Sequence, residues 1–211
     1  VRIEARQGTT LASGTIDAFG RDGPGGKVML LGPRVGLIRN STINVSGRTG
    51  GGTALVGGDF QGGNPDIPNA ERTYAGPDTL ITADAIETGS GGKVIIWADD
   101  WTKFYGTINA RGGAQGGDGG FVEVSGKQTL HFNGKVDTTA PHGATGTLLL
   151  DPATLQITNG AAVAGDLSGN AADGTVLAGD ADGGTTNGVA GQTLGGLAGT
   201  TNVILEATGQ I

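Results

Sequence analysis

Short apolar runs recur along the chain, and each run follows a pair of small residues that is usually Gly-Gly. The runs are KVMLL from Lys27, TALV from Thr53, KVIIW from Lys93, FVEV from Phe121 and TLLL from Thr147. Alternate residues of an extended strand point to opposite faces, so each run presents one apolar face and one mixed face. Runs of four or five residues bounded by glycine predict short strands rather than helices.

The spacing of these runs indicates a repeat. Successive small-residue pairs are separated by 26, 40, 28 and 26 residues. A second short element, a small residue followed by a β-branched one, recurs in four of the repeats, at Ile16, Ile43, Ile108 and Val136. About 26 residues with three short β segments and no helical pattern describes one turn of a parallel β-helix, whose turns stack at the strand spacing of about 4.8 Å.

The alternation predicts ladders of side chains running along the stack. The inward positions are Val28, Leu30, Val94, Ile96, Val122, Val124, Leu148 and Leu150, and the outward ones are Met29, Ile95, Glu123 and Leu149. Counting onward at equal offsets predicts a second inward ladder of Ile38, Phe104 and Phe132. Stacked identical positions of this kind supply the core of a solenoid.

Two segments depart from the repeat. Residues 57–87 contain three of the seven prolines, and we expect them to leave the solenoid as a loop or hairpin that rejoins near DTLITADA. Residues 1–150 therefore form regular turns with one insertion. Residues 151–211, rich in Gly, Ala and Asp, are expected to continue the β-helix with wide loops. We expect about seven turns in all.

Composition narrows the class of protein. The chain has 44 glycines, 4% aromatic residues and 16% charged residues, against about 25% charged in a typical domain. So little aromatic bulk cannot fill a thick core, whereas thin stacked turns need little. The net charge of −7 and the lack of a basic patch argue against nucleic acid as a partner.

Cysteine is absent, so disulfides and cysteine-ligated metals are excluded. No apolar run approaches the roughly 20 residues that a membrane-spanning helix needs. The chain opens on VRIEAR and stops at TGQI, both of which resemble the middle of a strand. We therefore expect a segment of a longer protein.

One corner of the repeat carries candidate chemistry. Trp97 and Trp101 flank the acids Asp99 and Asp100, and aromatic rings beside carboxylates are typical of saccharide sites. In the equal-offset alignment, Asp99 matches Pro33 and Lys127, so other turns fill this corner with unrelated residues. We interpret the corner as a solvated turn whose tryptophans shield an outer face. The alternative is a polysaccharide-binding or polysaccharide-degrading module that uses these four residues, with Tyr74 from the insertion.

Other candidates are weaker. Residues 112–121 and 177–188 resemble glycine-rich calcium repeats, but neither recurs in tandem, and turn-forming Asp-Gly explains the aspartates (Asp166, Asp173, Asp180 and Asp182) equally well. His131 and His142 lie at different repeat positions and predict neither a catalytic triad nor a zinc site. The sequence predicts no catalytic residue, metal or cofactor.

Several stretches, taken together, resemble one family. They are WADDWTKFYGTINARGG, GGFVEVSGKQTLHF and TGTLLLDPATLQI, within a similarity that spans roughly residues 10–160. They are similar to the repeat region of filamentous-haemagglutinin-type large exoproteins, the passengers of two-partner secretion in Gram-negative bacteria and cyanobacteria. The resemblance implies a right-handed parallel β-helix. It also implies export of the parent protein through an outer-membrane barrel, and carries over no catalytic residues.

We therefore expect a non-enzymatic stalk segment of a secreted, cell-surface adhesin or extracellular filament. Its expected partners are flanking turns or other copies of the same protein at the β-helix ends, the secretion barrel, and cell-surface glycans or receptors. A β-helix whose end strands are unpaired needs such a neighbour, because open sheet edges pair with other chains.

Overall fold

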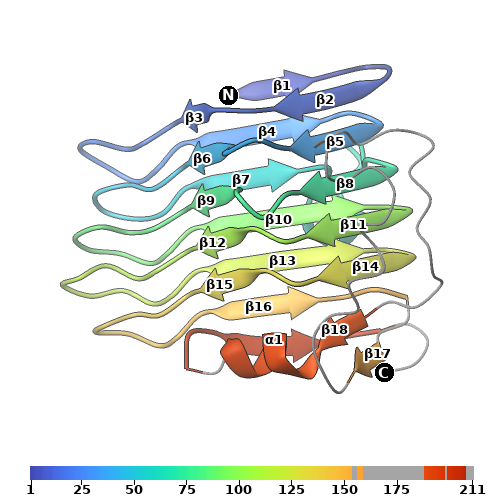
Figure 1. Cartoon of the computed structure of the whole chain (residues 1–211). Helices are drawn as coiled ribbons and strands as arrows, with labels where there is room; N and C mark the ends of the chain where they lie inside the picture. Colours follow the sequence, from blue (N-terminus) through green and yellow to red (C-terminus); the bar gives the residue numbers. More distant parts are fainter. Residues whose placement is uncertain (154–155, 159–187, 198, 208–211) are drawn as a thin grey trace.

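The computed structural model of the chain describes residues 1–153, 156–158, 188–197 and 199–207. These residues wind into a right-handed coil of parallel strands, stacked from the amino-terminal end downward (Figure 1). Each of the first five turns contributes one strand to each of three sheets, and every strand pairing between turns is parallel. The all-β parallel β-helix predicted from the repeat is confirmed.

We call the three sheets A, B and C in the order in which a turn visits them. Sheet A contains β1 (Arg2–Glu4), β4 (Lys27–Leu31), β7 (Thr53–Val56), β10 (Lys93–Ala98), β13 (Phe121–Gly126), β16 (Thr147–Leu150) and β19 (Asn202–Leu205). Sheet B contains β2 (Thr9–Ala12), β5 (Arg34–Leu37), β8 (Arg72–Ala75), β11 (Trp101–Phe104), β14 (Thr129–Phe132), β18 (Gly188–Ala190) and β17 (Gln156–Thr158). Sheet C contains β3 (Thr15–Asp17), β6 (Thr42–Asn44), β9 (Leu80–Thr82), β12 (Thr107–Asn109) and β15 (Lys135–Asp137).

The turn count differs from the expected seven. Sheet C has five strands, so five turns are complete in the described residues. After β16 the regular sequence stops, because β17 and β18 both join sheet B and the helix α1 (Gly191–Gly196) follows β18 where a strand of sheet C would come next. The chain returns to the stack at β19, which pairs with β16 in register.

The core is the set of inward ladders. Val28, Val94, Val122 and Leu148 align through consecutive pairings of sheet A, with Ala54 in the turn between the first two, and all five are fully buried. In sheet C the ladder is Ile16, Ile43, Ile81, Ile108 and Val136. The predicted sheet A ladder is therefore confirmed. The sheet C ladder also includes Ile81, from a segment that was assigned to the insertion.

The second predicted ladder is wrong by one residue in its first member. Phe104 pairs with Phe132, and the rings stack with centroids 5.7 Å apart. On the other side Phe104 pairs with Ala75, which pairs with Leu37 rather than Ile38. The path from sheet A to sheet B is one residue shorter in the second turn than in the fourth, so equal offsets fail beyond the corner.

Glycine pairs start each strand of sheet A because the backbones of successive turns meet there. A Cβ added at Gly92 would overlap the carbonyl oxygen of Gly52 in the turn above, and one added at Gly120 would overlap the carbonyl oxygen of Gly92. The column continues at Gly146, whose added Cβ would overlap the carbonyl oxygen of Gly120. The repeated GG is thus a steric requirement of the stack.

Buried threonines close the corner between sheets A and B. Thr10, Thr73 and Thr102 are inward residues of sheet B, and their hydroxyls donate to the carbonyl oxygens of Leu31, Trp97 and Ser125, each at 2.7 Å. Each acceptor lies at the end of the sheet A strand one turn further along. These bonds satisfy carbonyl groups at a buried corner and tie consecutive turns together.

We expect Thr102→Val to lower the free energy of unfolding by about 1–2 kcal/mol, because the carbonyl of Ser125 loses a buried donor. Valine fits the position sterically, since Val35 occupies the aligned site in β5. Urea unfolding measures the change. The control is Thr53→Val at the start of β7, which should change stability by less than about 0.5 kcal/mol, because the Thr53 hydroxyl makes no hydrogen bond with the described residues. Equal stability of the two variants would contradict the role of the hydroxyl.

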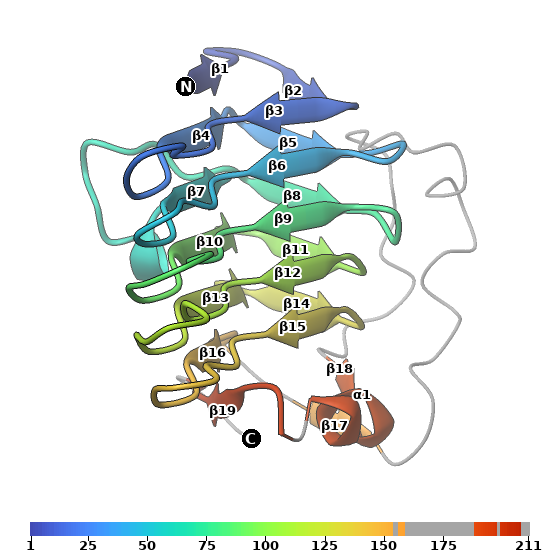
Figure 2. The same ribbon diagram turned by 90° about the vertical axis from the view of Figure 1, so that its left-hand side faces the viewer.

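The insertion is shorter than expected. Residues 72–87 belong to the regular stack, because β8 and β9 pair in register on both sides. Only residues 57–71, here called the insertion loop, leave it, between β7 and β8. The loop contains a short 3₁₀ turn, η1 (Phe60–Gly62), and lies beside the outer face of sheet A (Figure 2).

Candidate functional site

The acid–tryptophan corner is divided between two faces of the coil. Trp97 lies on the outer side of sheet A, packed with Leu55 and Ile95. Trp101 lies on the outer side of sheet B, packed with Tyr74. Each indole is only 4% exposed. The two rings that flank the acids in sequence therefore do not form one platform for a sugar.

The two acids of this corner hold the returning end of the insertion loop. An oxygen of Asp99 accepts hydrogen bonds from the indole N–H of Trp97 and from the side-chain amide of Asn69, both at 3.1 Å. Asp100 lies 3.3 Å from the guanidinium of Arg72. Their backbone N–H groups donate to the carbonyls of Ala70 and Glu71. The pair thus connects β10 and β11 to the returning insertion loop.

The outer face of sheet B is buried around Trp101. Tyr74 is a residue of β8, in register with Lys103, and not part of the insertion as expected. The ammonium of Lys103 lies 5.2 Å from the Trp101 ring centroid and the guanidinium of Arg72 lies 5.8 Å from it, so the ring faces two cations. Burial raises the pKa of Tyr74, and the nearby Asp78 adds to the rise. A saccharide-binding role for Trp97, Asp99, Asp100 and Trp101 remains a prediction, while the structure gives each a packing or polar partner.

The insertion loop covers a carboxylate that alternation predicted to be outward. Glu123 does lie on the outer face of sheet A, but it is fully buried. Both its oxygens accept the backbone N–H of Gln61, at 3.1 and 3.2 Å. Gln61 adopts a left-handed backbone conformation with φ of 50°, which is uncommon for a residue with a side chain. Its side-chain amide donates a hydrogen bond to Asp151 at 3.0 Å.

The second anchor of the insertion loop is an ion pair. The ammonium of Lys93 lies 3.0 Å from Asp59, and the ring of Phe60 contacts that of Phe121 edge-on at 5.8 Å. Burial raises the pKa of Asp59, but hydrogen bonds from the Asn64 amide, the Phe60 N–H and Lys93 outweigh it and lower the pKa to about 2. Asp59 therefore stays ionised at neutral pH.

Glu123 behaves in the opposite way. Burial raises its pKa to about 7, and the charge of Asp151 adds to the rise. Hydrogen bonds from the Gln61 N–H and the Ser125 hydroxyl and the charge of Lys93 act against it. Sequence alternation missed this group because it reports the face of a strand and not what covers it. The available signal was the cluster of apolar outward residues around it: Leu55, Ile95, Trp97 and Phe121.

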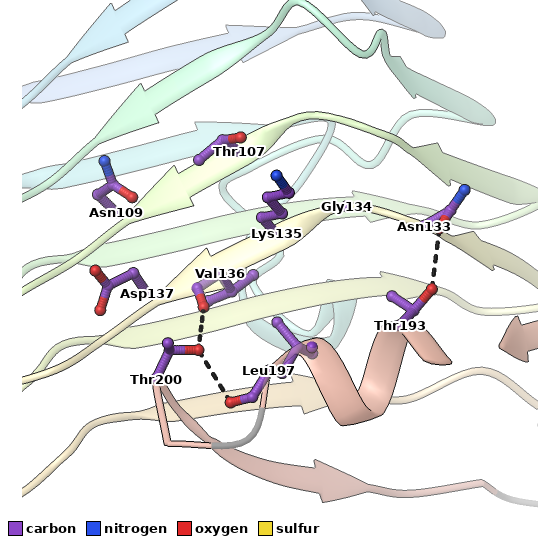
Figure 3. A pocket seen from close by; sticks show the side chains of 11 residues that line it. Thr107, Asn109, Asn133, Gly134, Lys135, Val136, Asp137, Thr193, Leu197 and Thr200 are labelled. Carbon is purple, nitrogen blue, oxygen red and sulfur yellow. Dashed lines mark hydrogen bonds between the residues drawn. The ribbon is translucent and has the colours of Figure 1, made fainter. Parts of the chain in front are cut away.

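A pocket of about 400 Å³ lies between sheet C and α1, away from the insertion loop (Figure 3). Its sheet wall consists of outward residues of β12 and β15, which pair as Thr107 with Lys135 and Asn109 with Asp137. Its other wall comes from α1 and the residues after it, including Leu197 and Thr200. The sequence analysis did not identify this pocket, because nothing in the glycine-rich tail indicated a helix.

The remaining candidates are dispersed. His131 is a buried residue of β14, whereas His142 is exposed in a corner loop. Within 112–121, Asp118 accepts the backbone N–H of Ala144 at 2.8 Å and so braces the next turn. The stretch 177–187 with Asp180 and Asp182, and Asp166 and Asp173, lie outside the described residues. Among the described residues, no group of three or more His, Cys, Asp or Glu side chains is arranged to hold a metal ion.

Within the described part of the chain, no helix has the length and apolar character needed to cross a membrane. No protein-family model matches the sequence, and no curated protein matches it.

Proposed function

We propose that this chain is a structural stalk segment of a secreted bacterial surface adhesin or extracellular filament, and not an enzyme. The observation that carries the proposal is the continuous in-register stacking of turns, with one short side loop clamped onto the outer face of sheet A. Apart from the insertion loop, stacked turns contact mainly their neighbours, so length can be added without changing the rest of the molecule. This is the property that a stalk requires.

The chemistry of the acid–tryptophan corner supports the same proposal. A glycosidase needs two carboxyl groups on opposite sides of a bond, about 5–10 Å apart. Here Asp99 binds Asn69 and Trp97, and Asp100 binds Arg72. The residues on which a polysaccharide-degrading alternative rests thus already hold the loop and the corner together.

The amino-terminal end of the stack supports the proposed partners. Ile3 of β1 is 43% exposed and lies in register with Leu30 of the core ladder. An open parallel edge with an apolar residue above the core favours pairing with a further β turn. We propose that flanking turns of the same protein, or of another copy, cover this edge.

The experiment is immunogold electron microscopy of cells that produce the native protein, with antibodies raised against this segment. The proposal expects label on fibres or rods outside the cell, and loss of label after external protease treatment of intact cells. Label confined to the cell interior would contradict it. So would discrete compact particles whose purified form degrades polysaccharides. Deleting the outer-membrane secretion barrel should abolish surface label while leaving the chain detectable inside.

A further inference from the structure

The sheet wall of the pocket between sheet C and α1 carries both hydrogen-bond donors and acceptors. Thr107, Asn109, Lys135 and Asp137 form a two-by-two array on the outer face of β12 and β15. Neighbouring strands lie about 4.8 Å apart, so the amide of Asn109 and the carboxylate of Asp137 stand side by side. In Figure 3 Thr107 and Asn109 lie above Lys135 and Asp137, and Thr200 and Leu197 of the segment at the end of α1 lie below them.

Hydrogen bonds within the protein leave part of this array free for a ligand. One oxygen of Asp137 accepts the N–H and the hydroxyl of Thr139, at 3.0 and 2.7 Å, while its second oxygen accepts no hydrogen bond from the described residues. The ammonium of Lys135 has no ion pair among the described residues. One cation and one anion make the lining neutral overall.

The opposite wall is fixed to the sheet and not merely adjacent to it. The hydroxyl of Thr193 in α1 donates to the Asn133 side-chain oxygen at 2.9 Å, and the hydroxyl of Thr200 donates to the carbonyls of Val136 and Leu197 at 3.0 and 2.9 Å. Leu197 is 2% exposed. This contact uses the side-chain oxygen of Asn133 and directs its amide nitrogen away from Thr193 as a hydrogen-bond donor.

We propose that this pocket binds a small neutral saccharide, a monosaccharide or disaccharide, through adjacent hydroxyl groups. A hydroxyl both donates and accepts, so neighbouring hydroxyls of a sugar match a carboxylate oxygen beside an amide. The volume of about 400 Å³ lies within the range of small-molecule sites. No aromatic side chain lines the pocket, so a dissociation constant on the order of 1 mM is expected, as for a small polar ligand.

The binding role is independent of the stalk function, since a structural segment need not bind any sugar. It also uses none of the four residues of the acid–tryptophan corner. Both outward rows of sheet C continue upward from the pocket, and the row of Asn109 and Asp137 runs on through Thr82, Asn44 and Asp17. These three residues do not line the pocket. Sheet C therefore supplies its own controls.

The test is saturation-transfer NMR and calorimetry on the whole chain with a panel of glucose, galactose, N-acetylglucosamine and their disaccharides. Saturable binding of at least one sugar is expected. Asp137→Asn should weaken it at least fivefold, while its remaining oxygen still accepts from Thr139. Asp17→Asn is the matched control, because Asp17 accepts the N–H of Phe19 in the same way at 3.1 Å but lies four turns away from Asp137. Asp17→Asn should leave binding unchanged.

Three results would overturn the proposal. The first is absence of saturable binding for every sugar in the panel at 20-fold above the expected constant. The second is equal binding by Asp137→Asn and Asp17→Asn, which would place the ligand elsewhere. The third is preferential binding of glycine or another zwitterionic amino acid over the sugars, which would assign Lys135 and Asp137 to a different ligand class.

Discussion

Gly92→Ala is expected to lower the free energy of unfolding by at least about 3 kcal/mol. The added methyl group has no space, because its position overlaps the carbonyl oxygen of Gly52 and the backbone of Gly51 in the turn above. Backbone atoms in a paired sheet cannot move aside as a flexible side chain can. The substitution therefore separates two turns that otherwise pair in register along β7 and β10.

Urea unfolding followed by tryptophan fluorescence measures this effect, since Trp97 and Trp101 lie in the turn that Gly92 begins. Gly23→Ala is the matched control: an added Cβ meets no atom within 4 Å there, and the backbone is not in the left-handed region. That variant should be as stable as the parent, or slightly more so through lower entropy of the unfolded chain. If Gly92→Ala unfolded at the same urea concentration as Gly23→Ala, the steric requirement for glycine at the start of the sheet A strands would be disproved.

Glu123→Gln is expected to be about 3 kcal/mol more stable than the parent at pH 8 and nearly equal to it at pH 4. Folding raises the pKa of Glu123 from 4.5 to about 7, chiefly through burial. The folded state therefore holds a proton that the unfolded state has already lost between these two values. Stability from this group is complete below pH 4.5 and is lost as the pH rises through about 7. Glutamine keeps an oxygen for the Gln61 N–H and cannot ionise.

The charged groups facing Glu123 from neighbouring elements are Lys93, Asp59 and Asp151, with Glu206 close to the Gln61 side chain. Asp59 does not confuse the measurement, because its pKa is lowered from 3.8 to about 2 and its contribution is lost only as the pH falls through that lower range. Asp66→Asn, an exposed acid of the same loop, is the control. Parallel stability curves for Glu123→Gln and the parent from pH 4 to 8 would refute the burial of an ionisable carboxyl.

The repeat was predictable because it is a translation of one unit along the stack. The spacings of 26, 40, 28 and 26 between small-residue pairs equal the register offsets of Lys27, Thr53, Lys93, Phe121 and Thr147 in sheet A. A steric column of glycines and a ladder of inward β-branched or leucine residues leave a periodic trace in any sequence that forms them. Neither needs knowledge of the tertiary structure.

The predictions that failed depend on the number of residues in a corner between two sheets, or on which segment covers the outer face of a sheet. Ile38 was assigned to the ladder of Phe104, although Leu37 occupies that place, because a corner one residue shorter is invisible to counting. Glu123 was predicted to point outward, and it does lie on the outer face of sheet A. It is nevertheless buried, because the insertion loop covers it through Gln61, which precedes it by 62 residues. The helix α1 was not predicted, because its sequence contains no apolar residues at helical spacing.

The corner between β7 and β8 shows what this architecture permits. Fifteen residues replace the two that join sheets A and B in the turn before, while Ala54 and Thr73 keep their alignment with the turns on both sides. The coil thus tolerates added sequence at that corner without transmitting the change along its axis. New loops grafted there, with a hydrogen bond like that of Asn69 to Asp99 at the return, would leave and rejoin the stack at a fixed height. A protein built this way can diversify its surface one turn at a time while its length and stiffness stay the same.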